Sequence, residues 1–230
     1  MPDITINGPD GDFSGYLATP ANGSGGGVLV IQEIFGVNKD MRSHCDHLAA
    51  AGYFALCPDI FWRQEPGIQL TDQSEEEWAR AFELYQGFDL EKGVGDLRIS
   101  LALLKTIDGC NGKAGTVGFC LGGLLAYLVA AQSDADCSVS YYGVGIDEQL
   151  SAASTIKSPT LLHIAEEDGF VSKEAQAKIN EKLSNHSSIE IHNYPNVDHA
   201  FARHNGLNFD STAAALAEER TMACFAANLS

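Results

Sequence analysis

The sequence predicts an α/β protein whose mainly parallel central sheet is covered by helices on both faces. Short runs rich in β-branched and aromatic residues alternate with longer amphipathic runs along most of the chain. The 230 residues are 45% hydrophobic, with seven prolines and no repeated tract. These values suit one globular domain over residues 1–230 and argue against a disordered, collagen-like or solenoid protein.

Each expected element follows from a local pattern. Six short β-rich runs predict strands at residues 28–32, 53–57, 115–119, 138–142, 160–164 and 189–194. Helical patterns between them cover residues 39–51, 74–86, 97–107, 121–132, 173–183 and 211–228. Ser74, followed by three glutamates, is typical of a capped first turn, and Gly52 is a stop signal. Residues 1–20, around the turn-forming GPDGD, predict a hairpin at the sheet edge.

Charge and hydropathy exclude several classes of partner. Acidic residues exceed basic ones by 31 to 14, a net charge of −17, with no basic run to attract nucleic acid or anionic membranes. An anionic small molecule would need a local arginine. The longest apolar run, residues 121–131, is about half a bilayer span, and the first residues lack a signal-peptide pattern. We expect a cytoplasmic protein that acts on a small molecule, and we favour a monomer over an oligomer.

Two further features suggest binding sites but have simpler explanations. The glycine-rich residues 23–27 precede a strand, whereas a phosphate-binding loop lies between a strand and a helix, so we interpret them as a plain loop. His44, Cys45 and His47 have no fourth ligand nearby and fit ordinary helix surface or core. We expect no metal or organic cofactor. The six cysteines form no C-x-x-C pair and suit free thiols: Cys45, Cys57, Cys110, Cys120, Cys137 and Cys224.

The strongest functional motif is Gly118-Phe119-Cys120-Leu121-Gly122-Gly123, at the junction of a predicted strand and a predicted helix. It matches the nucleophile elbow G-x-Nu-x-G, in which a sharp turn lifts the nucleophile above the sheet. The helix N-terminus favours a thiolate at Cys120, and the Leu121 N–H points to where an oxyanion forms. The alternative is a buried cysteine in a tight turn. The motif predicts an α/β-hydrolase fold with Cys120 as nucleophile.

The order of residues along the chain supplies partners for this cysteine. An α/β-hydrolase presents its nucleophile, acid and histidine in that order, each after a strand. Asp168 ends an acidic loop after the strand at 160–164, and we prefer it to Glu166 and Glu167 because it directly precedes a glycine turn. His199 follows the strand at 189–194. We therefore predict a Cys120–His199–Asp168 triad.

Glu33 is a carboxylate among apolar residues at the end of the first parallel strand. Burying such a group is unfavourable unless it is paired, so it is either functional or a salt-bridged structural acid. The same loop supplies the second oxyanion N–H in this fold, here expected from Ile34.

With these motifs assembled, the chain closely resembles the dienelactone hydrolase (carboxymethylenebutenolidase) family of α/β-hydrolases. The resemblance rests on blocks that run nearly end to end: QEIFGVN (32–38), CPD (57–59), FDLEKGVGDL (88–97), GFCLGG (118–123), YYGVG (141–145), HAFAR (199–203) and AAALAEERT (213–221). It implies that Cys120 attacks an enol-lactone carbonyl, that His199, oriented by Asp168, relays the proton, and that Glu33 contacts the resting thiol and moves as substrate binds.

The resemblance also indicates a substrate pocket. Arg203 stands at one family position that binds the substrate carboxylate. The family's second pocket arginine falls at Trp78, with Arg80 two residues further on another helix face, and a family tyrosine falls at Phe82. We count Phe35 and Tyr142 among the expected substrate contacts as well. The predicted substrate pocket therefore departs from the family pattern at Trp78 and Phe82.

The sequence therefore predicts a hydrolase that cleaves a small activated ester or enol-lactone, carrying a carboxylate, through an acyl-cysteine intermediate. Two alternatives stay open. One is a thiol-redox or peroxide-responsive protein that uses Cys120, although no resolving cysteine is close in sequence. The other is a non-catalytic protein that binds a small acid on the same scaffold.

Overall fold

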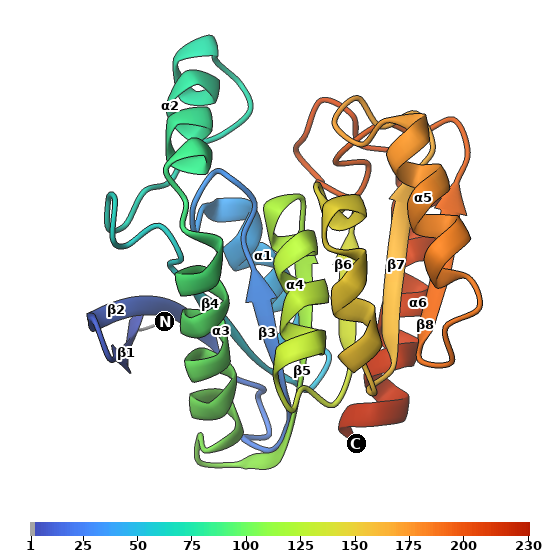
Figure 1. Ribbon diagram of the computed structural model, residues 1–230. Helices are drawn as coiled ribbons and strands as arrows, with labels where there is room; N and C mark the ends of the chain where they lie inside the picture. Colours follow the sequence, from blue (N-terminus) through green and yellow to red (C-terminus); the bar gives the residue numbers. More distant parts are fainter. Residues whose placement is uncertain (1–2) are drawn as a thin grey trace.

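The computed structural model describes residues 3–230 and contains one eight-stranded sheet in the order β1-β2-β4-β3-β5-β6-β7-β8 (Figure 1). Strand β1 is antiparallel to β2, and β2 is antiparallel to β4. The other six strands, in the sheet order β4-β3-β5-β6-β7-β8, all run parallel to one another. This confirms the predicted mainly parallel α/β fold with an edge hairpin. The strands are β1 Asp3–Gly8, β2 Gly11–Ala18, β3 Gly25–Ile31, β4 Phe54–Pro58, β5 Cys110–Phe119, β6 Ser138–Tyr141, β7 Thr160–Ala165 and β8 Ile189–Tyr194.

Helices cover both faces of this sheet, as expected for a parallel sheet. In Figure 1, α3, α4 and α5 lie in front of the strands and α1 and α6 lie behind them, while α2 projects beyond the upper edge. Each face therefore has its own hydrophobic core. The helices are α1 Lys39–Ala50, α2 Glu75–Gln86, α3 Leu90–Lys105, α4 Leu121–Gln132, α5 Lys173–Leu183 and α6 Ser211–Leu229, with short 3-10 turns η1 Ile146–Glu148 and η2 Leu150–Thr155.

Side-chain caps fix the helix starts. The Asn38 side chain accepts hydrogen bonds from the backbone of Asp40 and Met41 at the start of α1. Ser74 caps α2, as predicted. Helix α3 begins at Leu90, well before the expected residue 97, because Asp89 caps it by accepting from the Lys92 N–H. The sequence pattern alone missed this first part of α3.

The glycine-rich residues 23–27 were expected to form a plain loop, and the structure shows that this was wrong for part of the tract. Residues 25–27 are the first residues of β3 and not part of a loop. A Cβ atom on Gly25 would lie 2.1 Å from the Gly52 carbonyl oxygen, and one on Gly26 would lie 2.5 Å from that of Leu229. These glycines let the start of β3 pass close to neighbouring backbone, which is a packing function and not a ligand-binding one.

The most apolar segment of the chain is a core helix. Residues 121–130 of α4 are all buried, in front of the sheet and against η2 and α3. Within residues 3–230, no helix combines the length and the apolar character needed to cross a bilayer.

The parallel strands place four loops at one edge of the sheet. The loops after β3, β5, β7 and β8 begin at the carboxyl ends of strands that point the same way (Figure 1). These loops carry Glu33, Cys120, Asp168 and His199. Chain topology therefore brings residues distant in sequence to a single edge.

Close packing between α4 and β3 supplies a test of this architecture. A Cβ on Gly122 would lie 2.3 Å from the Ile31 carbonyl oxygen and 2.6 Å from that of Gln32. We expect Gly122→Ala to lower the free energy of unfolding by about 2 kcal/mol or more, because backbone must move to admit the methyl group. Urea denaturation measures the change.

Gly95→Ala is the matched control, since this α3 glycine has open space around it. Alanine there should raise the free energy of unfolding by about 0.5–1 kcal/mol through helix propensity. Equal effects of the two substitutions would contradict the tight α4–β3 contact.

Candidate functional site

Cys120 occupies a strained turn between β5 and α4. Its backbone has φ 56° and ψ −116°, a region that residues with a side chain rarely adopt. The flanking glycines make the turn possible, because a Cβ on Gly118 would lie 1.8 Å from the Gly122 carbonyl oxygen. The Cys120 N–H donates to the Tyr141 carbonyl oxygen at 3.1 Å, which ties the turn to β6. This geometry is that of the predicted nucleophile elbow.

Asp168 and His199 are brought into direct contact from the loops after β7 and β8. His199 Nδ1 lies 3.0 Å from Asp168 Oδ1 and 2.9 Å from Oδ2, and both side chains are buried. Asp168 Oδ1 also accepts from the backbone N–H of Phe170 at 2.8 Å and of Val171 at 3.1 Å. The carboxylate is therefore fixed by backbone amides and in turn fixes the imidazole. Glu167 pairs with Lys173 at the surface.

The other nitrogen of His199 is available for chemistry. In the described part of the chain, His199 Nε2 is buried and has no hydrogen-bond partner. Burial disfavours the imidazolium, but the neighbouring Cys120 and the hydrogen bond with Asp168 outweigh it and raise the pKa of His199 to about 10. Tyr142 and Phe170 hold the ring edge-on, at centroid distances of 4.9 Å and 4.8 Å. His199 and Cys120 line the same pocket.

Glu33 belongs to a buried ion-pair network. Its Oε2 accepts from Arg203 Nε at 2.8 Å, and Arg203 Nη1 donates to Asp72 Oδ2 at 2.7 Å. Within residues 3–230, the buried Glu33 Oε1 has no hydrogen-bond partner. Burial opposes the charged form of Arg203, but Glu33 and Asp72 raise the pKa of its guanidinium. Glu33 is thus salt-bridged through one of its two carboxylate oxygens.

The expected oxyanion donors lie next to Cys120. Leu121 is the first residue of α4, so its N–H has no acceptor within the helix. Ile34 follows Glu33 and lines the pocket that contains Cys120. Their role as donors remains a prediction.

The pocket beside Cys120 is lined mainly by aromatic and aliphatic side chains. Its lining consists of Ile34, Phe35, Trp78, Phe82, Tyr85, Cys120, Val144, Phe170, His199 and Arg203. Four of the predicted substrate contacts, Phe35, Trp78, Phe82 and Arg203, therefore line this pocket, and their contact with substrate stays a prediction.

Two predicted contacts lie elsewhere. Arg80 is on another face of α2, where it pairs with Glu65 and Glu83 at the surface. Tyr142 is buried beneath the His199 ring and supports it from the core. Neither Arg80 nor Tyr142 is therefore part of the lining of the pocket beside Cys120.

Sequence reasoning missed three residues of the site. Tyr85 could have been found, because it continues the i, i+4, i+7 face of α2 that begins with Trp78 and Phe82. Phe170 stands two residues after Asp168 and is half exposed, a weaker signal. Asp72 carries no local signal, because its role depends on Arg203, which is far along the chain.

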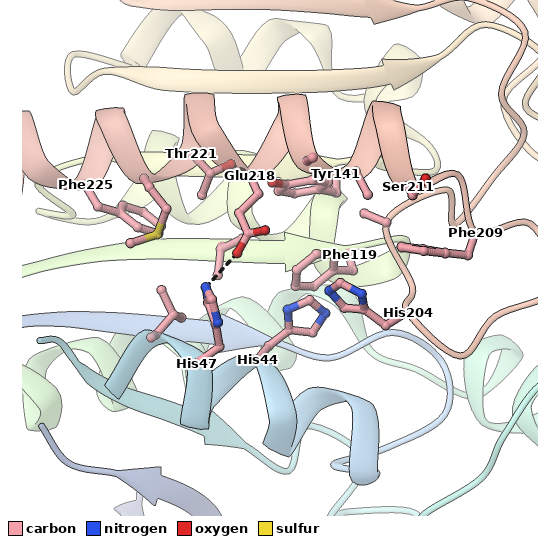
Figure 2. Close-up of a pocket in the computed structure, with 16 residues that line it drawn as sticks. His44, His47, Phe119, Tyr141, His204, Phe209, Ser211, Glu218, Thr221 and Phe225 are labelled. Atoms are coloured by element: carbon pink, nitrogen blue, oxygen red, sulfur yellow. Dashed lines mark hydrogen bonds and ion pairs between the residues drawn. The ribbon is translucent and has the colours of Figure 1, made fainter. Parts of the chain in front are cut away.

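A second hollow lies behind the sheet as it is seen in Figure 1, between α1 and α6, and Figure 2 shows it in close-up. His44 stacks on Phe119 at 4.5 Å, and His47 pairs with Glu218 at 2.6 Å. Cys45 is buried in the core behind the sheet. Burial and the neighbouring His204 lower the pKa of His44 to about 4. Among residues 3–230, no three potential metal ligands lie close enough together to hold an ion.

Comparison with known proteins agrees with this geometry. The Dienelactone hydrolase family model matches residues 13–229. The chain is 47% identical to a protein of Azospirillum brasilense named "Putative carboxymethylenebutenolidase", with full coverage of both chains. It is 40% identical to a carboxymethylenebutenolidase of Pseudomonas putida, over 95% of this chain and 93% of the relative.

A solved structure from Klebsiella pneumoniae, titled "Putative Dienelactone Hydrolase", superposes with a TM-score of 0.87. It is 25% identical and covers 98% of this chain and 97% of its own. The elbow, the fold and these relatives together establish that the chain belongs to the dienelactone hydrolase family and is an ester- or lactone-cleaving enzyme of the α/β-hydrolase fold.

Proposed function

We propose that the enzyme cleaves a small activated ester or lactone through a Cys120–His199–Asp168 triad and an acyl-cysteine intermediate. The observation that carries this proposal is the state of His199. Its Nδ1 is held by Asp168, while its unpartnered Nε2 lies in the pocket that Cys120 lines. Family membership supports the reaction class.

The raised pKa of His199 supports its role as the proton donor. An imidazolium with a pKa of about 10 is protonated at neutral pH, and the neighbouring Cys120 is one cause of that shift. The thiolate sulfur is the better nucleophile. The proton that a leaving group needs is therefore already stored on His199.

The reaction then proceeds in two balanced steps. The Cys120 sulfur attacks the carbonyl carbon, and the amides of Leu121 and Ile34 donate to the oxygen that becomes negative. The tetrahedral species collapses as its carbon–oxygen bond breaks, and His199 Nε2 protonates the leaving oxygen. Neutral His199 next removes a proton from water, the hydroxide attacks the acyl-cysteine, and the acid leaves as the thiolate and imidazolium re-form. In a lactone the leaving hydroxyl stays on the same product.

The alternatives receive less support from the site. The other five cysteines lie outside the lining of the Cys120 pocket, so a resolving thiol is not at hand for a redox role. A purely binding protein would not need the histidine that Asp168 orients. We keep the cytoplasm as the expected location.

The binding of a substrate carboxylate is a separate question from the reaction itself. Arg203 is the residue that the family resemblance assigns to a substrate carboxylate. Its Nε and Nη1 already donate to Glu33 and Asp72, so a substrate carboxylate would compete with two protein carboxylates.

The triad can be tested by substitution. We expect Cys120→Ala to lower kcat/KM on p-nitrophenyl acetate by about a thousandfold or more, because the covalent route is lost. Cys110→Ala is the control, since Cys110 begins β5 and lies outside the pocket. Mass spectrometry of enzyme quenched during turnover should show one acetyl group on Cys120. Unchanged turnover in Cys120→Ala would refute the proposal.

The charge state of His199 can be titrated by NMR. We expect its ring to titrate near pH 10 in the wild type and markedly lower in Cys120→Ala, because the neighbouring negative charge is removed. A His pKa raised above its unfolded value of about 6.5 adds stability that is complete below that pH and is lost as pH rises through about 10. The unfolding free energy of Cys120→Ala should therefore be lower than that of the wild type at pH 6.5, and this difference should become smaller as the pH rises to 10. A wild-type ring that titrates near 6.5 would contradict this interpretation.

Glu33 can be tested through the reactivity of the resting thiol. In Glu33→Gln a buried negative charge disappears and Arg203 loses one partner, and both changes favour a thiolate. We expect alkylation of Cys120 by iodoacetamide near neutral pH to become several-fold faster, roughly 3- to 10-fold. Glu190→Gln is the control, because this exposed acid lies on β8 and pairs with His192. Rates equal to those of the wild type across neutral pH would remove Glu33 from the mechanism.

A further inference from the structure

The pocket beside Cys120 is lined by aromatic side chains that are partly exposed. Phe170 is 49% exposed and Phe82 is 37% exposed. Both lie against Trp78, with centroid distances of 6.3 Å and 5.5 Å and near-parallel rings at 17° and 29°. The edge of Phe35 meets the Trp78 ring at 5.0 Å. This arrangement is a stacking surface suited to a flat ring.

The pocket offers few polar contacts to a substrate. Besides Cys120 and His199, which are the proposed catalytic residues, the side chains in its lining that can form hydrogen bonds are Arg203, Tyr85 and Trp78, and the Trp78 indole N–H already donates to the Asp72 carbonyl oxygen at 3.1 Å. Of these three side chains, only Arg203 is charged at neutral pH. Recognition of an anionic substrate therefore depends on how much of its charge Arg203 presents.

Two buried carboxylates compensate that charge. Glu33 and Asp72 both contact the Arg203 guanidinium, and the exposed fractions of their side chains are 2% and 6%. The Arg203 guanidinium also stacks over the Phe35 ring at 5.0 Å, which fixes its plane. Two negative charges around one positive charge leave the network with a net charge of −1. A carboxylate brought to this arginine would meet a negative field in a poorly screened site.

We propose that the enzyme selects neutral esters or lactones that bear an aromatic ring, and that Asp72 disfavours carboxylate-bearing substrates by compensating the charge of Arg203. The ring stacks on Trp78, Phe82 and Phe170, while the reacting carbonyl lies over Cys120. Asp72 acts through Arg203 and is a positioning residue. The proposal rests on the proposed esterase function and narrows the substrate class expected from the family resemblance.

A matched pair of esters tests the charge preference. The probes are 4-acetoxyphenylacetate and its methyl ester, in which a methylene group separates the variable carboxyl from the leaving phenol. We expect the wild type to hydrolyse the neutral ester with a kcat/KM at least about tenfold higher, after correction for the hydroxide rates. Work at about 0.15 M salt screens the overall negative charge of the protein but not the buried network.

Asp72→Asn then shows whether Asp72 sets the preference. We expect the ratio of kcat/KM for the acid to that for its methyl ester to rise roughly tenfold, mainly through a lower KM for the acid. A merely structural role for Asp72 would change both substrates alike and leave the ratio constant. Asp134→Asn, which removes an equal charge from a side chain that is 82% exposed, should also leave the ratio constant.

Phe170→Ala tests the stacking surface. We expect the ratio of kcat/KM for phenyl acetate to that for the activated but non-aromatic trifluoroethyl acetate to fall about fivefold. Leu207→Ala is the control, because Leu207 is 77% exposed and lies outside the pocket. An unchanged ratio in Phe170→Ala would overturn the aromatic part of the proposal.

The outcomes separate this proposal from the proposed function. Hydrolysis of the acid at least as fast as its methyl ester, with turnover dependent on Cys120, overturns the neutral-substrate preference and leaves the esterase function intact. No turnover of either ester by the wild type overturns both.

Discussion

The backbone turn at Cys120 is the constraint on which the rest of the site depends. A residue with a side chain is held at φ 56° between a strand and a helix, and adjacent glycines admit the backbone contacts that this needs. The turn fixes the position of the sulfur relative to the sheet. Asp168 and His199 can lie near this sulfur because the loops after β7 and β8 begin at the same edge of that sheet. Backbone amides at residues 170 and 171 then keep the carboxylate still.

The parts of the site that sequence predicted are those set by local chain geometry. The elbow appears in consecutive residues, and each triad partner directly follows a strand that its composition reveals. Parallel pairing places such positions together whatever the side chains are. Among three neighbouring acids, Asp168 is the one that contacts His199, and the turn after it directs two amides to its carboxylate. Its catalytic role stays a prediction. Most strand and helix positions were also predicted, but the starts of α3, β3 and β5 and the short 3-10 turns η1 and η2 were not.

The parts that sequence did not predict depend on side chains meeting across long separations. Asp72 and Glu33 both find Arg203, and neither the loop around Asp72 nor the strand end at Glu33 indicates which cation will neutralise it. The expectation that Arg203 binds a substrate carboxylate failed to anticipate this competition. Arg80 pairs with Glu65 and Glu83 for a similar reason, since a flexible cation takes the nearest available acids. Ion-pair partners are a property of the packed molecule and not of the local pattern.

Helix α2 carries none of the three residues that we propose as the catalytic triad. It projects beyond the carboxyl edge of the sheet (Figure 1) and contributes Trp78, Phe82 and Tyr85 to the pocket, whereas Cys120, Asp168 and His199 come from loops tied to β5, β7 and β8. Exchanges on one face of this helix can therefore redirect the enzyme to new compounds while the reaction centre stays intact. In enzymes with this arrangement, substrate specificity can change through substitutions on a single helical face.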